Sequence, residues 1–280
     1  EDGIRYLVRS RGLGDVYKRQ HQYITEWSEI APWKANEQVE QDLIICRALV
    51  ELFSDEFITE KVAFRGGTAI HKLFLEPEPR FSEDIDLVQI AAEPIGSSID
   101  KIRKLLSFLG EPKIKQKDRN TTLIFNFESE MQPVQILKLK VVINCREHFS
   151  VFDLKKKAFK VNSLWFNGQC NITTYEFEEL PGTKLRALYQ RKKGRDLYDL
   201  FKALRSTDSL SKEKIIQVFL DYMNHEFSGI PSKLSYLKNL EDKMKDPEFL
   251  GDTTALLRPD ETYDPNEGFD LVRKEIIEMM

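Results

Sequence analysis

Apolar residues along the first half of the chain change between two regular spacings. Residues 36–53 carry apolar side chains at three- to four-residue intervals, which is the period of an amphipathic helix. Residues 97–110 show the same helical pattern, and Gly110 marks its end. Short apolar or alternating runs predict strands at 61–64, 82–90, 121–129 and 134–144. We expect the last two strands to lie side by side and antiparallel.

The pattern changes at Pro181, after which helical spacing dominates. Residues 182–206 predict two helices that are broken near Gly194. Beyond Ser211 the chain remains mostly helical, apart from a long polar loop over residues 251–269. No internal repeat or low-complexity tract interrupts this order.

These patterns divide the chain into three parts. Residues 1–20 show no apolar periodicity and resemble translated adapter sequence, so we expect a non-native segment there. Residues 21–178 mix helices and strands, and residues 164–180 predict a loop with short strand character. Residues 179–280 are helical. The predicted fold class is therefore α+β, with a mixed sheet and flanking helices followed by an α-helical C-terminal domain.

Composition excludes several classes of protein. The 280 residues are 31% charged and 41% hydrophobic, with a net charge of −4, which is ordinary for a soluble globular protein. Cys46, Cys145 and Cys170 lack the paired spacing of a zinc site or a disulfide framework, and they fit a reducing, cytoplasmic environment. No apolar run reaches the roughly 18 residues of a membrane span. Residues 101–119 and 138–160 are locally basic, which favours a polyanionic partner only weakly.

Two aspartates one residue apart, Asp84 and Asp86, lie in the predicted strand 82–90. Alternate side chains of a strand share one face, so both carboxylates project together, about 6–7 Å apart along the backbone. Two like charges this close favour a cation between them. Oxygen ligands without His or Cys nearby favour Mg²⁺ or Mn²⁺ over zinc.

A Gly-Gly-Thr turn, residues 66–68, precedes the carboxylate pair. The two glycines allow the backbone to approach a ligand closely, and a helix over residues 68–75, with Thr68 near its N-cap, would present free N–H groups to an anion. Each feature alone is more often a tight connection or a solvated strand edge. Together they are what an NTP and its Mg²⁺ require for in-line attack on a phosphorus atom.

The stretches GGTAIHKL and RFSEDIDL resemble the nucleotidyltransferase signature of the DNA polymerase β-like superfamily. More closely, they resemble the AbiEii-like toxins of type IV toxin–antitoxin systems, which include the MenT toxins. The resemblance runs from about Trp33 to Leu204 and implies a nucleotidyltransferase core followed by a helical domain. It implies a triphosphate turn at Gly66, Gly67 and Thr68, and metal ligands at Asp84 and Asp86.

A second motif, KLRALYQRKKGRDLYDL over residues 184–200, resembles the family's later motifs, in which a helix lysine and an Arg-Asp pair face the nucleotide. By position, the resemblance implies that Lys184 contacts phosphate and stabilises the negative charge of bond breaking. It implies that Asp196 acts as a base or an orienting carboxylate. The alternative is a solvated basic connection in which Asp196 caps the second helix.

Three residues around the first motif, Arg80, Ser82 and Lys72, complete the predicted site. Arg80 and Ser82 share the face of the aspartates and are assigned to nucleotide binding, although a salt bridge from Arg80 to Asp84 is equally consistent. Lys72 is expected to reach the phosphates from the helix. His71 is expected at the surface or in packing, because no second histidine accompanies it.

The sequence departs from the superfamily at one position. Many members carry a third carboxylate on a neighbouring strand, which helps to deprotonate the attacking hydroxyl. The corresponding strand here is expected over residues 136–144, and it has Val142 where relatives often have an acid. Glu147 is the nearest acid but lies past the strand. Either Asp196 takes that role, or metal use differs, or catalysis is weak, and we favour the first.

The resemblance implies a metal-dependent nucleotidyltransferase, using Mg²⁺ or Mn²⁺, that moves a nucleotide from an NTP to an acceptor hydroxyl. The acceptor is expected to be RNA, and the better-understood family members modify the acceptor end of tRNA. The protein is expected to be the toxin of a toxin–antitoxin or phage-defence system. Its antitoxin would be a separate protein, and the two proteins need not contact each other directly. Two alternatives remain: transfer to a small molecule or a protein side chain, and a nucleotide-binding module without transfer.

Overall fold

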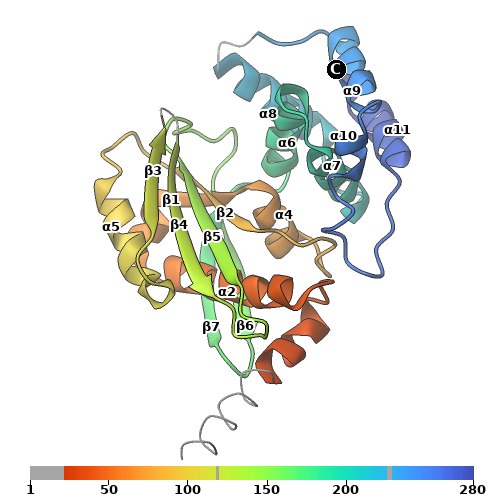
Figure 1. Cartoon of the computed structure of the whole chain (residues 1–280). Helices are drawn as coiled ribbons and strands as arrows, with labels where there is room; N and C mark the ends of the chain where they lie inside the picture. Colours follow the sequence, from red (N-terminus) through yellow and green to blue (C-terminus); the bar gives the residue numbers. More distant parts are fainter. Residues whose placement is uncertain (1–21, 118–119, 226–228) are drawn as a thin grey trace, which may run out of the picture.

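The computed structural model describes residues 22–117, 120–225 and 229–280 (Figure 1). The segment 1–20, which the sequence predicts to be non-native, lies outside the described residues. The first part of the chain builds a seven-stranded mixed sheet with flanking helices, and the second part is helical. The predicted α+β fold class is confirmed. None of the helices in the described ranges is long and apolar enough to cross a membrane.

The sheet has the strand order β3-β4-β5-β2-β1-β7-β6. The pairs β2–β5 and β1–β7 are parallel, and the other neighbours are antiparallel. The strands are β1 Val62–Arg65, β2 Asp84–Gln89, β3 Lys113–Lys117, β4 Asn120–Glu128, β5 Ile136–Asn144, β6 Lys155–Asn162 and β7 Asn167–Thr174.

One face of this sheet carries the main core. Along β4 and β5, Leu123, Phe125, Leu139, Val141 and Ile143 are fully buried, and the residues between them are not. This alternation is the signature of a strand with one packed face. The packed face meets helices α2 Asn36–Phe53, α3 Glu56–Lys61 and α5 Gly96–Leu105.

The C-terminal helices bury a second apolar cluster. Leu185, Leu188, Leu197, Leu200 and Phe219 belong to it, and Phe177 packs against both clusters. A domain boundary at residues 178 and 179 is consistent with this separation but stays a prediction. The helices are α6 Glu179–Gln190, α7 Gly194–Ser206, α8 Lys212–His225, α9 Lys233–Lys243, α10 Pro247–Gly251 and α11 Pro265–Glu275.

Most predicted elements are confirmed, including the antiparallel pair β4–β5 and the helix break before Gly194. For residues 164–180 the expected strand character is confirmed by β7, but the expected loop is wrong where the strand spans eight residues and where α6 begins. Strands β3 and β6 were also missed. Both are edge strands, rich in exposed lysine, and edge strands that resist aggregation carry such charges in place of a clear apolar pattern.

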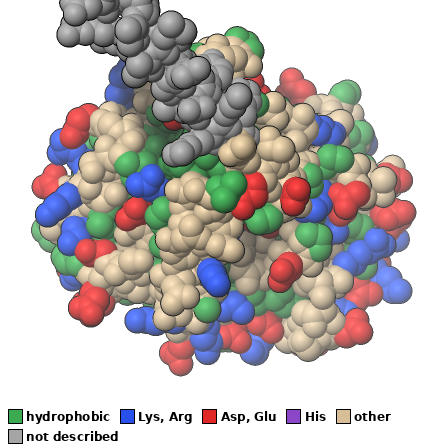
Figure 2. Space-filling view, turned by 90° about the horizontal axis from the view of Figure 1, so that it is seen from below, with side chains coloured by type: hydrophobic (Ala, Val, Ile, Leu, Met, Phe, Trp, Pro, Cys, Tyr) green, Lys and Arg blue, Asp and Glu red, His purple; other side chains and the backbone are tan. Residues whose placement is uncertain are grey.

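Charged side chains of both signs are scattered over one face of the molecule (Figure 2). Figure 2 shows Lys and Arg interspersed with Asp and Glu on the face seen from below, without a broad region of one sign. A mixed surface of this kind matches the small net charge of −4.

Candidate active site

The turn between β1 and α4 (Gly66–Phe74) is built on two glycines that have no room for a side chain. Gly66 has a φ of +85°, and a Cβ there would collide with the Asp86 carboxylate. A Cβ on Gly67 would collide with the Arg80 guanidinium and lie 2.9 Å from Asp199 Oδ2. The helix therefore begins at Gly66 and not near Thr68, which corrects the predicted N-cap.

Thr68 holds this turn against the start of β2. Its hydroxyl donates to the backbone carbonyl of Asp84 at 2.6 Å and lies 2.6 Å from Ser82 Oγ. Only 1% of Thr68 is exposed. Thr68 and Ser82 therefore lie at the predicted site, and the Thr68 hydroxyl serves to position the carboxylate strand.

Asp84 and Asp86 project from the same face of β2, as the sequence predicts. In register, Asp86 is opposite Arg65 on β1 and Val142 on β5. Lys140 Nζ, opposite Asp84, lies 3.3 Å from its Oδ1 atom. Burial raises the pKa of Asp86, and the charge of Asp84 raises it further. Val142 thus occupies the position beside Asp86 where a third carboxylate would stand.

A divalent cation fits this carboxylate pair. In the described part of the chain, no group of three or more His, Cys, Asp or Glu side chains could hold a metal ion. Mg²⁺, however, is commonly bound through one or two carboxylates together with substrate phosphates. Asp84 and Asp86 supply two such ligands on one strand face, and their unfavourable proximity is what a cation would relieve.

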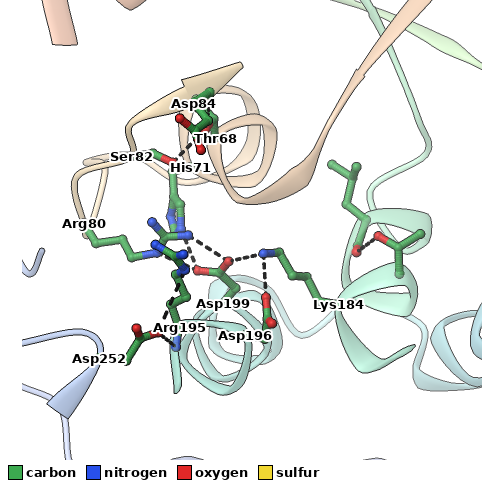
Figure 3. Close-up of polar contacts among 12 residues, drawn as sticks. Thr68, His71, Arg80, Ser82, Asp84, Lys184, Arg195, Asp196, Asp199 and Asp252 are labelled. Carbon is green, nitrogen blue, oxygen red and sulfur yellow. Dashed lines mark hydrogen bonds and ion pairs between the residues drawn. The ribbon is translucent and has the colours of Figure 1, made fainter. Parts of the chain in front are cut away.

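Lys184, on α6, belongs to a buried charge network centred on Asp199 of α7 (Figure 3). Its Nζ atom lies 2.9 Å from Asp196 Oδ1 and 2.9 Å from Asp199 Oδ2. Arg80 donates two hydrogen bonds to Asp199, from Nε at 2.7 Å and from NH2 at 2.8 Å. His71 Nε2 lies 2.8 Å from Asp199 Oδ1. The pairing of Arg80 with Asp84, which the sequence left open, does not occur.

The opposite charges of this network keep Asp199 and Lys184 ionised despite their burial. Burial alone would raise the pKa of Asp199, but Arg80 and Lys184 outweigh it and hold that pKa well below the usual range. For Lys184, burial is likewise outweighed by Asp196 and Asp199, which raise its pKa. Burial and the nearby Arg80 lower the pKa of His71 to about 4, so His71 is neutral at pH 7. Lys184 therefore stays cationic at the edge of the site.

Asp196 lies inside the network and not at a cavity wall. It is 0% exposed and accepts hydrogen bonds from Lys184 and from Arg191, whose Nε and NH2 atoms lie 2.7 and 2.8 Å away. It does not cap α7, because Lys193 is the N-cap residue. The geometry fits an orienting carboxylate, and the favoured role of Asp196 as the base is not supported.

The structure corrects the prediction that Lys72 reaches the phosphates. Its ammonium donates 2.8 Å hydrogen bonds to Asp42 and to Glu78, and its side chain is 1% exposed. Lys72 ties α4 to α2 and to the following loop, away from the glycine turn. Of the two positions expected for His71, the surface or packing, the structure shows burial, with the ring nitrogen Nε2 beside the Asp199 carboxylate.

Glu147 is held by two arginines. Arg186 NH1 lies 2.8 Å from Glu147 Oε1, and Arg65 NH1 contacts Oε2. Although burial opposes it, the two guanidinium groups lower the pKa of Glu147 to about 2. This carboxylate is therefore committed to an ion-pair network and does not replace the acid that is missing at Val142.

Two cavities meet at Asp86, Lys184 and Arg191. The smaller cavity, of about 110 Å³, is highly polar and includes the turn, the start of β2 and α7: Gly67, Thr68, Arg80, Ser82, Asp84 and Arg195. The larger cavity, of about 390 Å³, opens between the sheet and α6: Arg65, Gly66, Asn120, Val142, Asn144 and Arg186. The structure thus brings together all predicted site residues except Lys72 and the enclosed Asp196.

Sequence reasoning missed several residues of this site. Asp199 follows Asp196 by one helical turn in the stretch RDLYDL, and this spacing was the available signal for it. Arg191 and Arg195 lie in the basic connection that had been weighed as solvated. Arg65 directly precedes the glycine turn and is paired through its register with Asp86.

Comparisons with known proteins agree with this geometry. Residues 47–275 match the family model "Nucleotidyl transferase AbiEii toxin, Type IV TA system". MenT4, a nucleotidyltransferase toxin from Mycobacterium tuberculosis H37Rv, has a similar structure, with a TM-score of 0.59 at 15% identity over 94% of this chain and 90% of that one. A nucleotidyltransferase candidate from H. pylori gives 0.52 at 15% identity, over 88% and 99%. At this identity the two structures support the fold alone.

No curated protein matches the chain. The family model nevertheless spans most of the sequence and includes the glycine turn, both aspartates of β2 and the charge network of α6 and α7. This chain belongs to the AbiEii nucleotidyltransferase family, the toxins of type IV toxin–antitoxin systems.

Proposed function

We propose that this protein transfers a nucleotide from an NTP to a hydroxyl group of RNA and releases pyrophosphate, acting as a toxin in the cytoplasm. The observation that carries the proposal is the meeting of two cavities at Asp86 and Lys184, beside a glycine turn that opens a helix. The smaller cavity suits the phosphates, and the larger cavity suits the nucleoside and the acceptor hydroxyl. The antitoxin of this protein would be a separate protein, and the proposed reaction requires no direct contact between the two.

The smaller cavity fits the triphosphate. Gly67 lies in the first turn of α4, where backbone N–H groups and the helix dipole favour an anion. Lys184, Arg191 and Arg195 add positive charge from the other side. Ser82 adds a hydroxyl donor. Lys184 is held by two carboxylates, so it is already oriented when charge develops on the phosphates.

The larger cavity would receive the nucleoside and the acceptor hydroxyl. Attack by this hydroxyl on the α-phosphorus forms a new phosphorus–oxygen bond and breaks the bond to the pyrophosphate. Asp86 lines both cavities, so it is the described carboxylate best placed to receive the hydroxyl proton. A Mg²⁺ or Mn²⁺ ion bound by Asp84 and Asp86 would neutralise phosphate charge and make the hydroxyl more acidic.

Two observations favour a second candidate, a nucleotide-binding module without transfer. Val142 stands where a carboxylate would flank Asp86, and Lys140 already pairs with Asp84. Both features weaken a metal site. Transfer to a small molecule or a protein side chain would use the same cavities, so only the acceptor distinguishes it from the first proposal.

The test is incorporation of each α-³²P-labelled NTP, with Mg²⁺ or Mn²⁺, into total bacterial RNA and protein. We expect label in RNA with the wild type, and its loss in Asp86→Asn and in Lys184→Ala. Lys72→Ala is the matched control, a buried lysine outside both cavities that should retain transfer where the variant is folded. Label in protein would change the acceptor, and NTP binding without any transfer would favour the binding module.

A further inference from the structure

The register of the sheet places five lysines on the same face as the reactive carboxylates. Lys140 is opposite Asp84 on β2, and on its other side it is opposite Ile124 of β4. Ile124 in turn is opposite Lys113 of β3. Residues that are opposite in register point to one face, so this face carries Lys113, Lys115, Lys117, Lys138 and Lys140.

This face is open to solvent over β3, β4 and β5. The packed core lies on the other face, and Figure 1 shows no helix crossing the side of these strands that is turned to the viewer. Lys138 and Asn126, which are opposite one another, are both exposed, as is every residue of β3. We call this surface the lysine face. It is defined by the five lysines together with Asn120, Thr122 and Asn126.

The lysine face is strongly basic for a protein of net charge −4. Against its five lysines, the outward residues of these three strands include one acid, Glu128, at the far end of β4. Within the described residues, Lys140 is the member of the five that has an ion-pair partner, Asp84. Positive charge that the fold leaves uncompensated suits a polyanion.

The face is continuous with the larger cavity. Asn120 and Asn144 are opposite one another across β4 and β5, and both line that cavity. Lys117 is the register partner of Asn120, so the lysine face begins at the edge of the larger cavity. From β2 to the edge strand β3 are three strand spacings, about 14 Å. Along β3 the lysines recur about every 7 Å.

We propose that the lysine face binds the phosphate backbone of the RNA strand whose terminal hydroxyl enters the larger cavity. The inference rests on the proposed function and deepens it by giving the acceptor a path. The outward residues of β3, β4 and β5 include no aromatic side chain on which bases could stack. Recognition there is therefore electrostatic, tolerant of sequence and strongly dependent on salt.

The experiment measures RNA binding by the full chain carrying Asp86→Asn, so that no transfer occurs during the measurement. A fluorescent single-stranded RNA is titrated at several salt concentrations against this protein and against a triple variant, Lys113→Ala, Lys115→Ala and Lys117→Ala. The matched control removes three exposed lysines from the opposite edge strand, with Lys155→Ala, Lys156→Ala and Lys160→Ala. Thermal unfolding confirms that each variant is folded.

We expect the β3 variant to bind RNA about tenfold more weakly, and its log–log salt slope to fall by about 2, at about 0.7 for each lysine. The β6 control should change affinity less than twofold. Arginine at the same three β3 positions keeps the charge and should restore binding. NTP binding should be unaffected in all of them.

Equal losses in the β3 and β6 variants would overturn the inference, as would polyglutamate competing as well as RNA, because the face would then be a general acidic-protein surface. Transfer assays with Asp86 intact separate the two proposals. If the β3 variant labels RNA as efficiently as the wild type, the proposed function is retained and the RNA-binding role of the lysine face is rejected. If lysine-dependent RNA binding occurs but no chain transfers label, the face stands and the function falls.

Discussion

The ion pairs of Glu147 give a stability prediction whose size follows from the structure. The carboxylate contacts Arg65 and Arg186 and is 8% exposed, so solvent screens it little. Its pKa is lowered from 4.5 to about 2 in the folded chain, against the opposing effect of burial. This gap corresponds to about 3 kcal/mol of folding free energy at neutral pH. Glu147→Gln, which keeps the shape and removes the charge, should therefore cost about 3 kcal/mol at pH 7.

The sign of the pH dependence is fixed by the direction of the pKa change. A carboxylate with a lowered folded pKa stabilises the fold fully above its unfolded pKa, here 4.5, and loses that contribution as the pH falls towards 2. The difference between the wild type and Glu147→Gln should thus shrink from about 3 kcal/mol at pH 7 to about 1 kcal/mol at pH 3. Urea denaturation followed by tryptophan fluorescence measures it, since acid effects elsewhere cancel in the difference.

The control is Glu128→Gln, which changes an exposed carboxylate at the end of β4 and should alter stability by less than about 0.5 kcal/mol at every pH. A Glu147→Gln cost below 1 kcal/mol at pH 7, or one that does not shrink in acid, would refute the ion-pair network. Glu147 would then be available for another role, including that of the acid missing beside Asp86.

Three further substitutions test the site. Asp86→Asn should abolish transfer yet raise the unfolding free energy at pH 7, because it removes a buried charge whose pKa burial and Asp84 have raised; equal or lower stability in denaturant titration would argue against it. Gly66→Ala should destabilise the chain by at least about 2 kcal/mol, while Gly96→Ala, with open space around it, should be nearly neutral in the same melts. Lys72→Met should lower stability without changing the NTP dissociation constant, whereas Lys184→Met should weaken NTP binding by at least tenfold in calorimetry.

The parts of this fold that could be predicted are those whose periodicity burial enforces. Strands β4 and β5 and the first four residues of β2 alternate because one face is packed, and α2 shows its apolar stripe for the same reason. The edge strands β3 and β6 have no such constraint, and their lysines gave no strand signal. The same lysines became informative only when the register showed which face they share.

The site divides along a similar line. Gly66, Gly67, Asp84 and Asp86 are close in sequence to the elements that position them, so local pattern was sufficient. Asp199 lies one helical turn after Asp196, but two of its partners, His71 and Arg80, are more than a hundred positions away, so spacing alone could not identify them. For Lys72, local position in the sequence was misleading. Its place on α4 beside the motif suggested a phosphate ligand, but its helix face turns to Asp42 of α2.

Asp199 also explains why the helical part of the chain is inseparable from the nucleotide site. Its carboxylate, on α7, neutralises Arg80 from the loop before β2 and Lys184 from α6, and all three side chains are nearly inaccessible to solvent. Removing the Asp199 carboxylate alone would leave the Arg80 guanidinium buried beside the glycine turn without its counter-charge, at a cost of several kcal/mol. The turn would then lose the support against which Gly67 packs. The division predicted near residue 178 separates the two hydrophobic clusters, while the charged side chains around Asp199 come from both sides of it.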